Sequence, residues 1–265
     1  MPPRTLSLPS RDDITEARRL IGSRVRRTPV MDVVLDSGAE VTLKLELFQH
    51  TGSFKPRGAF TSVLSQPQMP TTLVAASGGN HGLAVAHVGR VLGIPTEIFV
   101  PLTAPPVKVA RLHTLGATVH QVGQRFADAL EASLELAHAP GALAIHAYDT
   151  LPTVTGQGTL AAELDEQTQT DTVLIAVGGG GLIGGMASWW AQRTRIIAVE
   201  PETCPAMHQA LAAGSPVSVH PRGVAADSLG ASLIGSLGLA AVQAAAGRSV
   251  LVSDDDIRHA RQWLW

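Results

Sequence analysis

The stretch from Val173 to Ser188 reads VLIAVGGGGLIGGMAS. An apolar run of strand length, Val173 to Val177, leads into four consecutive glycines, and apolar residues continue beyond them. Glycine lets the backbone turn sharply, and N–H groups that converge at the start of a helix attract an anion. The stretch therefore predicts a buried strand, a loop that can hold a phosphate, and a helix. The alternative, a tight helix–sheet contact that binds nothing, stays open.

Two well-known nucleotide motifs describe this loop poorly. The dinucleotide pattern Gly-x-Gly-x-x-Gly can be placed on Gly179, Gly181 and Gly184, but nothing else in the run favours it over a simple phosphate site. A Walker P-loop requires Gly-Lys-Ser/Thr, and the run contains no lysine.

The same strand–loop–helix order repeats on both sides of this stretch. Short apolar runs predict strands at 72–76, 96–100, 118–122, 143–146, 172–177 and 195–199, and apolar residues at helical spacing predict helices at 81–92, 104–115, 126–139 and 182–192. Such alternation is typical of right-handed βαβ units and a parallel sheet. The sequence therefore predicts an α/β fold.

Other segments carry more local expectations. Val41 to Leu47 alternates apolar and polar residues, which predicts a half-exposed strand. Gly156-Gln157-Gly158 is expected to interrupt the chain before a helix at 159–164. Ser10 and Ser253 are expected to cap helices that begin at Arg11 and Asp254, each with acids in its first turn.

Composition bounds the class of protein. The 265 residues are 45% hydrophobic and 16% charged with a net charge of −2, which is typical of a globular protein and gives no electrostatic case for nucleic acid or an anionic membrane. The single cysteine, Cys204, fits a reducing cytoplasm. Met1 to Arg11 has no long apolar segment, so we expect no secretory signal. The glycines between Val173 and Ala191 argue against a membrane span there.

One lysine stands among small and apolar neighbours, in Gly52-Ser53-Phe54-Lys55-Pro56-Arg57-Gly58. Burial would disfavour its ammonium form, lower its pKa and free the amine as a nucleophile that can form a Schiff base. The alternative is an exposed lysine in a turn rich in glycine and proline.

A second glycine loop, Ser77-Gly78-Gly79-Asn80-His81-Gly82, also follows a predicted strand and opens a helix. Its N–H groups could hold a carboxylate, and the Asn80 amide could bond a ring hydroxyl. As alternatives, Asn80 caps the helix and His81 has a structural role. The histidines and acids show no metal-ligand spacing, so no metal site is expected.

These three features together describe one ligand. A reactive lysine, a phosphate loop without lysine and a carboxylate loop with an asparagine suit a compound that has an aldehyde, a phosphate and a ring hydroxyl and acts on an amino acid. Pyridoxal 5'-phosphate is such a compound.

Four ordered motifs carry a family resemblance. Ser53 to Ala59, Ser77 to Gly82, Gly156 to Thr159 and Gly178 to Leu182 resemble the fold type II pyridoxal-phosphate enzymes, among them the threonine/serine dehydratases, with serine racemase a near relative. The resemblance implies two three-layer αβα domains with mostly parallel twisted sheets, similar to tryptophan synthase β. It implies a large domain from 1–68 and 149–265, a small domain from 69–148, and a homodimer.

The resemblance also assigns roles. It implies a Schiff base from the cofactor to Lys55, which moves the α-proton, and β-elimination of L-threonine or L-serine to a 2-oxo acid and ammonia. The other implied contacts are Phe54 against the cofactor, Asn80 on the pyridine hydroxyl, Ser77, Gly78 and Gly79 on the substrate carboxylate, Gly178, Gly179, Gly180 and Gly181 on the phosphate, and Gly223 beside the ring.

Departures from the family pattern bear on the reaction. Similar serine racemases have a serine as second base where this chain has Gly78, which favours a dehydratase over a racemase. Glu200 matches one acid of a cation site in that relative, but Pro201 to Ala206 does not supply the second in the same way.

The C-terminal end raises a further expectation. In the family the chain continues past this point and supplies a residue that faces the pyridine nitrogen, whereas this sequence stops at Trp265, and we expect something to cover Trp263 and Trp265. A truncated homologue that binds the cofactor with little turnover, a racemase and a β-replacement enzyme stay open as alternatives.

Overall fold

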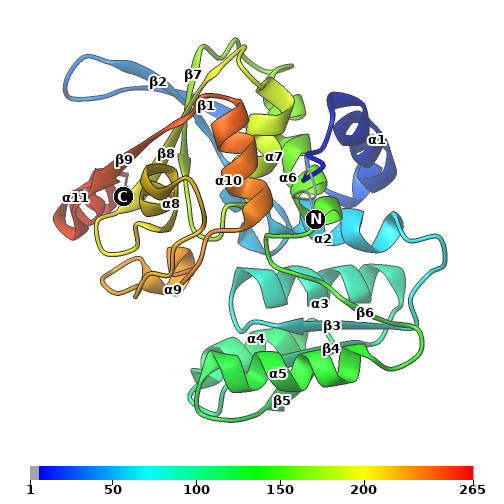
Figure 1. Ribbon diagram of the computed structural model, residues 1–265. Helices are drawn as coiled ribbons and strands as arrows, with labels where there is room; N and C mark the ends of the chain where they lie inside the picture. The colour runs from blue at the N-terminus through cyan, green and yellow to red at the C-terminus, as the bar shows by residue number, and fades with distance from the viewer. Residues whose placement is uncertain (1–5, 265) are drawn as a thin grey trace. The chain divides into compact units, whose positions relative to one another are not determined.

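The computed structural model describes residues 6–264, and their contacts form two compact units (Figure 1). One unit comprises Ala17–His146, and the other comprises the described residues up to Glu16 and from Ala147 onward. Helix α1 (Arg11–Ile21) runs across the first boundary. The domain boundaries expected from the sequence, 1–68 with 149–265 and 69–148, stay a prediction.

The Ala17–His146 unit contains a four-stranded parallel sheet in the order β5-β4-β3-β6. Its strands are β3 (Thr72–Ala76), β4 (Thr96–Val100), β5 (Thr118–Gln121) and β6 (Ala142–Ala144), and its helices are α2 (Lys55–Leu64), α3 (Asn80–Leu92), α4 (Pro106–Thr114) and α5 (Phe126–Ala137). Helices therefore alternate with parallel strands, as the apolar periodicity predicts.

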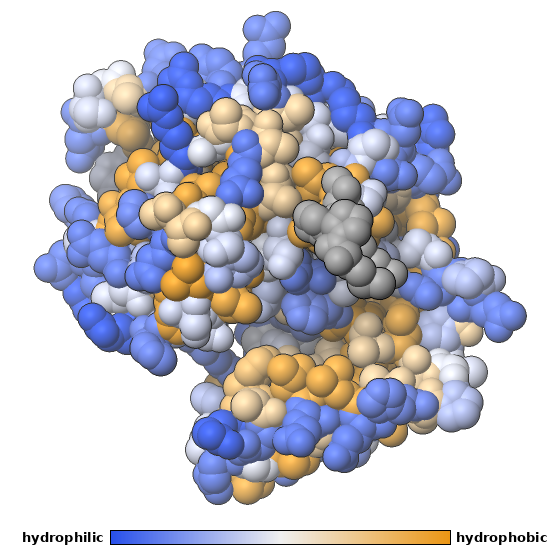
Figure 2. All heavy atoms as spheres, viewed as in Figure 1, coloured by the Kyte–Doolittle hydropathy of each residue, from blue (hydrophilic) through white to orange (hydrophobic). Residues whose placement is uncertain are grey.

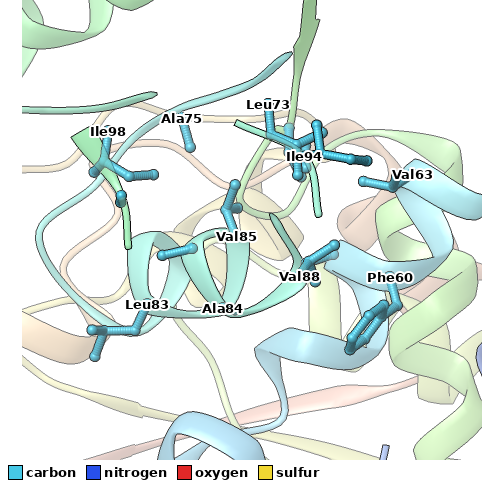
Figure 3. Packing of buried hydrophobic residues seen from close by; sticks show 14 of the residues in the cluster. Phe60, Val63, Leu73, Ala75, Leu83, Ala84, Val85, Val88, Ile94 and Ile98 are labelled. Carbon is cyan, nitrogen blue, oxygen red and sulfur yellow. The ribbon is translucent and has the colours of Figure 1, made fainter. Parts of the chain in front are cut away.

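The core of this unit follows the alternation of side chains along β3. Leu73 and Ala75 face α3, whose Val85 points toward the strand, and Phe60 and Val63 of α2 pack at the other end of α3 (Figure 3). Val74, between them in sequence, belongs to a separate cluster with Phe99 and Ala129 of α5. Both faces of the sheet are thus covered, which explains why its central strands read as continuous apolar runs.

The predicted strand at Val41–Leu47 is wrong in its second half. Strand β2 (Glu40–Lys44) pairs antiparallel with β1 (Val30–Val34), which the sequence analysis did not anticipate, and a 3-10 turn follows at Glu46–Phe48. The chain leaves the strand because the Glu46 carboxylate binds Arg57 and accepts a hydrogen bond from Thr28 Oγ1 at 2.6 Å. A long-range ion pair thus overrides the local alternation.

The second unit contains a three-stranded parallel sheet in the order β7-β8-β9. Its strands are β7 (Thr172–Ala176), β8 (Arg195–Pro201) and β9 (Arg248–Val252), and its helices are α6 (Leu151–Leu164), α7 (Gly181–Trp190), α8 (Ala206–Ala213), α9 (Ala226–Leu229), α10 (Ser236–Ala244) and α11 (Asp254–Leu264). The predicted α/β fold with parallel sheets is confirmed in both units.

The predicted break at Gly156–Gly158 is wrong, because α6 runs without interruption through these residues. A methyl group at Gly158 would lie 2.9 Å from the carbonyl oxygen of Gly185 on α7 and 2.7 Å from Ile14 Cδ1. A methyl group at Gly185 would lie 2.3 Å from Val154 O. These glycines let two helix backbones approach each other, and that gain offsets their low helix propensity.

Both predicted serine caps are confirmed. Ser10 Oγ accepts from Asp13 N at 3.1 Å, and Ser253 Oγ accepts from Asp256 N at 3.0 Å, while each aspartate accepts from the serine N–H.

Hydrophilic side chains gather at the left edge of Figure 2, where Figure 1 shows α11. Trp263 is 40% exposed on this helix, and Trp265 lies outside the described residues. Within residues 6–264, no helix has the length and apolar character needed to cross a membrane.

Gly158→Ala tests whether packing outweighs propensity in α6. Alanine would stabilise an exposed helix by about 1 kcal/mol. Here its methyl group must displace Ile14 or the backbone of α7, so we expect a loss of about 1–3 kcal/mol in the free energy of unfolding. Urea unfolding measures the change, and an increase in stability would contradict the close approach of the two helices.

Candidate active site

Lys55 opens α2 and is only partly exposed. Removal of its amine from water lowers its pKa to about 8. Its Nζ lies 5.3 Å from the centroid of the Phe54 ring, and Pro56 after it is buried. The apolar surroundings expected from the sequence are therefore present, and near neutral pH they raise the share of neutral amine that can act as a nucleophile or a base.

A buried ion pair fixes the segment that carries Lys55. Arg57 is 1% exposed and donates from Nε and Nη2 to the two oxygens of Glu46 at 2.9 and 2.8 Å. Paired, hydrogen-bonded geometry of this kind is what a buried guanidinium requires. Neither residue has a role that a local sequence pattern predicts, because the two partners lie in separate motifs.

The loop Ser77–Gly79 joins β3 to α3 and lies in the same unit as Lys55. Gly79 N donates to Ser77 Oγ at 3.2 Å, and a methyl group at Gly82 would lie 1.9 Å from Ser77 O. The loop is thus folded closely over the first turn of α3. A helix N-terminus attracts anions, and the role of this loop as a carboxylate site stays a prediction.

Asn80 and His81 have different surroundings at the start of α3. The N-cap is Gly79, so Asn80 is the first helical residue, and its side chain is exposed. The alternative that Asn80 serves as the cap is therefore wrong. His81 is buried and its Nε2 donates to Ile145 O at 2.7 Å. Burial, and secondarily the charge of Lys55, lower the pKa of His81 to about 3, so its ring is neutral and ties α3 to the end of β6.

The glycine loop Gly178–Gly181 leads from β7 into α7, in the other unit. Gly180 is the N-cap of α7 with a left-handed φ of 90°, a conformation that suits glycine. A methyl group at Gly179 would lie 2.2 Å from Tyr148 Cδ1, and one at Gly181 would lie 2.8 Å from Tyr148 Cα. The loop therefore needs glycine for its shape and for close packing, and its predicted role as a phosphate site stays a prediction.

The Tyr148–Asp149 pair supports this loop and was missed in the sequence. The Tyr148 ring covers the glycines, and its hydroxyl donates to Leu233 O at 3.4 Å. Burial first, and Asp149 second, raise the pKa of Tyr148, so its phenol stays protonated. Asp149 accepts from the N–H groups of Ser236 and Leu237, both at 3.0 Å, and so caps α10. No local pattern marks this pair, because its partners lie far along the chain.

Gly223 lies in a turn of the same unit, with a left-handed φ of 85°. The structure thus places Lys55, Phe54 and Ser77–Asn80 in the Ala17–His146 unit, and Gly178–Gly181 and Gly223 in the other. The roles predicted for these residues stay predictions.

Glu200 serves a structural purpose at the end of β8. It is fully buried and accepts from the N–H groups of Met207 and His208, both at 2.7 Å, at the start of α8. Burial is the largest influence and raises the pKa of Glu200, whereas these hydrogen bonds act to lower it. Among residues 6–264, no group of three or more His, Cys, Asp or Glu side chains has an arrangement that could hold a metal ion.

A family model described as "Pyridoxal-phosphate dependent enzyme" matches residues 21–265. The chain belongs to this family. The resemblance drawn from the four motifs is therefore confirmed, as is the dependence of the family on pyridoxal phosphate.

Individual relatives agree with this result. An L-threonine ammonia-lyase of Thermotoga maritima is 34% identical over 96% of this chain, and a biosynthetic L-threonine dehydratase of Corynebacterium glutamicum is 35% identical over 91%. The chain spans only 65% and 59% of the lengths of these two proteins. The solved structure of maize serine racemase is 33% identical, with a TM-score of 0.91 over 97% of this chain and 80% of the other.

Proposed function

We propose that this chain uses pyridoxal phosphate to eliminate the hydroxyl group of L-threonine or L-serine, giving a 2-oxo acid and ammonia. The observation that carries the proposal is the partly buried Lys55, whose pKa is lowered to about 8 at the start of α2. The threonine ammonia-lyase and threonine dehydratase relatives support the choice of substrate.

The bound cofactor supplies an electron sink for negative charge at the α-carbon of an amino acid. Lys55 is the residue that would hold the cofactor through its aldehyde, and its amine, once the amine of the substrate has displaced it, would accept the α-proton. The lowered pKa suits this task, because an ordinary lysine near pKa 10.4 would be protonated at neutral pH.

The remaining residues bind and orient. In the proposal, the N–H groups of Ser77, Gly78 and Gly79 hold the substrate carboxylate, and the exposed Asn80 amide bonds the ring hydroxyl. Gly178–Gly181 and the N-terminus of α7 hold the phosphate, where the close cover of Tyr148 excludes any larger residue. By the family resemblance, Phe54 and Gly223 would each contact the ring.

Further parts of the proposal rest on the resemblance and on composition. We propose a small domain at 69–148 and a homodimer, as the family resemblance implies. A cytoplasmic location is supported by the single, buried Cys204. The net charge of −2 supports small-molecule rather than nucleic-acid partners.

Lys55→Ala tests the proposed function directly. Loss of a positioned base and of the cofactor attachment should lower 2-oxo acid formation from L-threonine and L-serine by at least about 10²–10⁴-fold. Lys108→Ala, on α4, is the matched control and should retain activity. The proposal fails if the unaltered chain, supplied with pyridoxal phosphate, forms no 2-oxo acid from either amino acid, or if Lys55→Ala forms it at the same rate.

Gly78→Ser separates elimination from racemisation. A methyl group at Gly78 would meet only Val100 Cγ1, at 3.4 Å, which is an ordinary van der Waals contact, so the backbone of the loop accepts a Cβ at this position. We expect this variant to keep the fold and to gain measurable conversion of L-serine to D-serine, because the position then carries a hydroxyl that can move a proton. Chiral chromatography of the products measures the gain. D-serine formation by the unaltered chain at the rate of the variant would contradict the role given to Gly78.

A further inference from the structure

The three acids that open α11 have different partners. Asp256 makes the capping bonds with Ser253. Asp255 is exposed and pairs with Arg258 one turn along the helix. Asp254 instead reaches two segments that are distant in sequence, one at the end of β8 and one at the turn that contains Gly223.

Asp254 binds the turn from both sides. Its Oδ2 accepts from Val224 N at 3.2 Å, and its Oδ1 accepts from Thr203 Oγ1 at 3.4 Å. Thr203 in turn accepts, through its carbonyl oxygen, from Arg222 N at 3.2 Å. The residues before and after Gly223 are therefore both tied to the Thr203–Asp254 pair.

The backbone of Gly223 packs closely against the side chains of Asp254 and Thr203. A methyl group on it would be 2.5 Å from Asp254 Oδ2 and 2.6 Å from Thr203 Oγ1, and its φ of 85° is one that other residues adopt only with strain. Residue 223 can therefore carry no side chain while the carboxylate and the hydroxyl hold these positions.

We propose that Asp254, together with Thr203, is a positioning residue that fixes the turn at Gly223 and so sets the surface that this turn presents to the cofactor ring. The inference rests on the proposed function, in which Gly223 lies against that ring. Asp254 acts through the backbone of the turn. Its loss should therefore weaken cofactor binding more than it affects the stability of α11, whose caps are Ser253 and Asp256.

The test compares neighbouring acids of α11. Apo forms of the unaltered chain, Asp254→Ala and Asp255→Ala are titrated with pyridoxal 5'-phosphate, and binding is followed by tryptophan fluorescence and by the visible circular dichroism of the bound cofactor. Asp254→Ala loses the hydrogen bond to Val224 N in the turn and the one to Thr203 Oγ1 beside it, so we expect a Kd about tenfold weaker and a reduced dichroic band. Asp255→Ala should stay within about twofold of the unaltered chain, and its thermal unfolding is measured alongside.

Two further variants distinguish loss of the turn contact from general misfolding. Asp254→Asn keeps an acceptor oxygen for Val224 N, so its Kd should recover to within about threefold of the unaltered chain. Thr203→Val removes the other side chain of the pair, and a double-mutant cycle with Asp254→Ala should be non-additive, because both changes release the same turn.

The outcomes separate this inference from the proposed function. If the unaltered chain binds pyridoxal 5'-phosphate and Asp254→Ala binds it equally well, the positioning role of Asp254 is overturned and the proposed function stands. Equal losses of affinity in Asp254→Ala and Asp255→Ala would likewise overturn it, since they would reflect α11 as a whole. If the unaltered chain binds no cofactor, both proposals fail.

Discussion

An amine that must be neutral near physiological pH has to be partly removed from water, and the first turn of α2 does this for Lys55. The chain holds the amine there through the buried pair of Arg57 and Glu46, which ties the lysine segment to the 3-10 turn after β2. Removal of Glu46 would leave the buried Arg57 guanidinium without its carboxylate partner, at a cost of about 3–5 kcal/mol. The reactive group and the stability of its surroundings therefore depend on one contact.

Close backbone packing is the corresponding constraint in the second unit. Glycines at 158 and 185 let α6 and α7 touch, and those at 179 and 181 let Tyr148 cover the loop before α7. The N–H groups at the start of α7 are thereby held in a fixed arrangement, which is what an anion site requires. Glycine thus has two roles in this unit: it lets helix backbones approach each other, and it lets the loop before α7 adopt its conformation.

Features with local causes could be predicted from the sequence. The alternation of β3 to β5 with α3 to α5, both serine caps and both glycine loops follow from periodicity and turn chemistry within a few residues. Features caused by distant partners could not. Gly156–Gly158 reads as a break unless Gly185 is known to approach it, and Tyr148, Glu46 and Asp254 gain roles only through residues far along the chain. The family resemblance supplied what local patterns lacked, since it placed the motifs on one known fold.

The lowered pKa of Lys55 is the central physical claim, and the pH dependence of its labelling in the apo form tests it most directly. Competitive acylation followed by peptide mass spectrometry gives the protonation of each lysine separately. Deprotonation makes an amine reactive, so the labelling of Lys55 should rise as pH increases, with a midpoint at about 8. An ordinary exposed lysine has its midpoint near 10.4. A midpoint for Lys55 at or above that ordinary value would contradict the account.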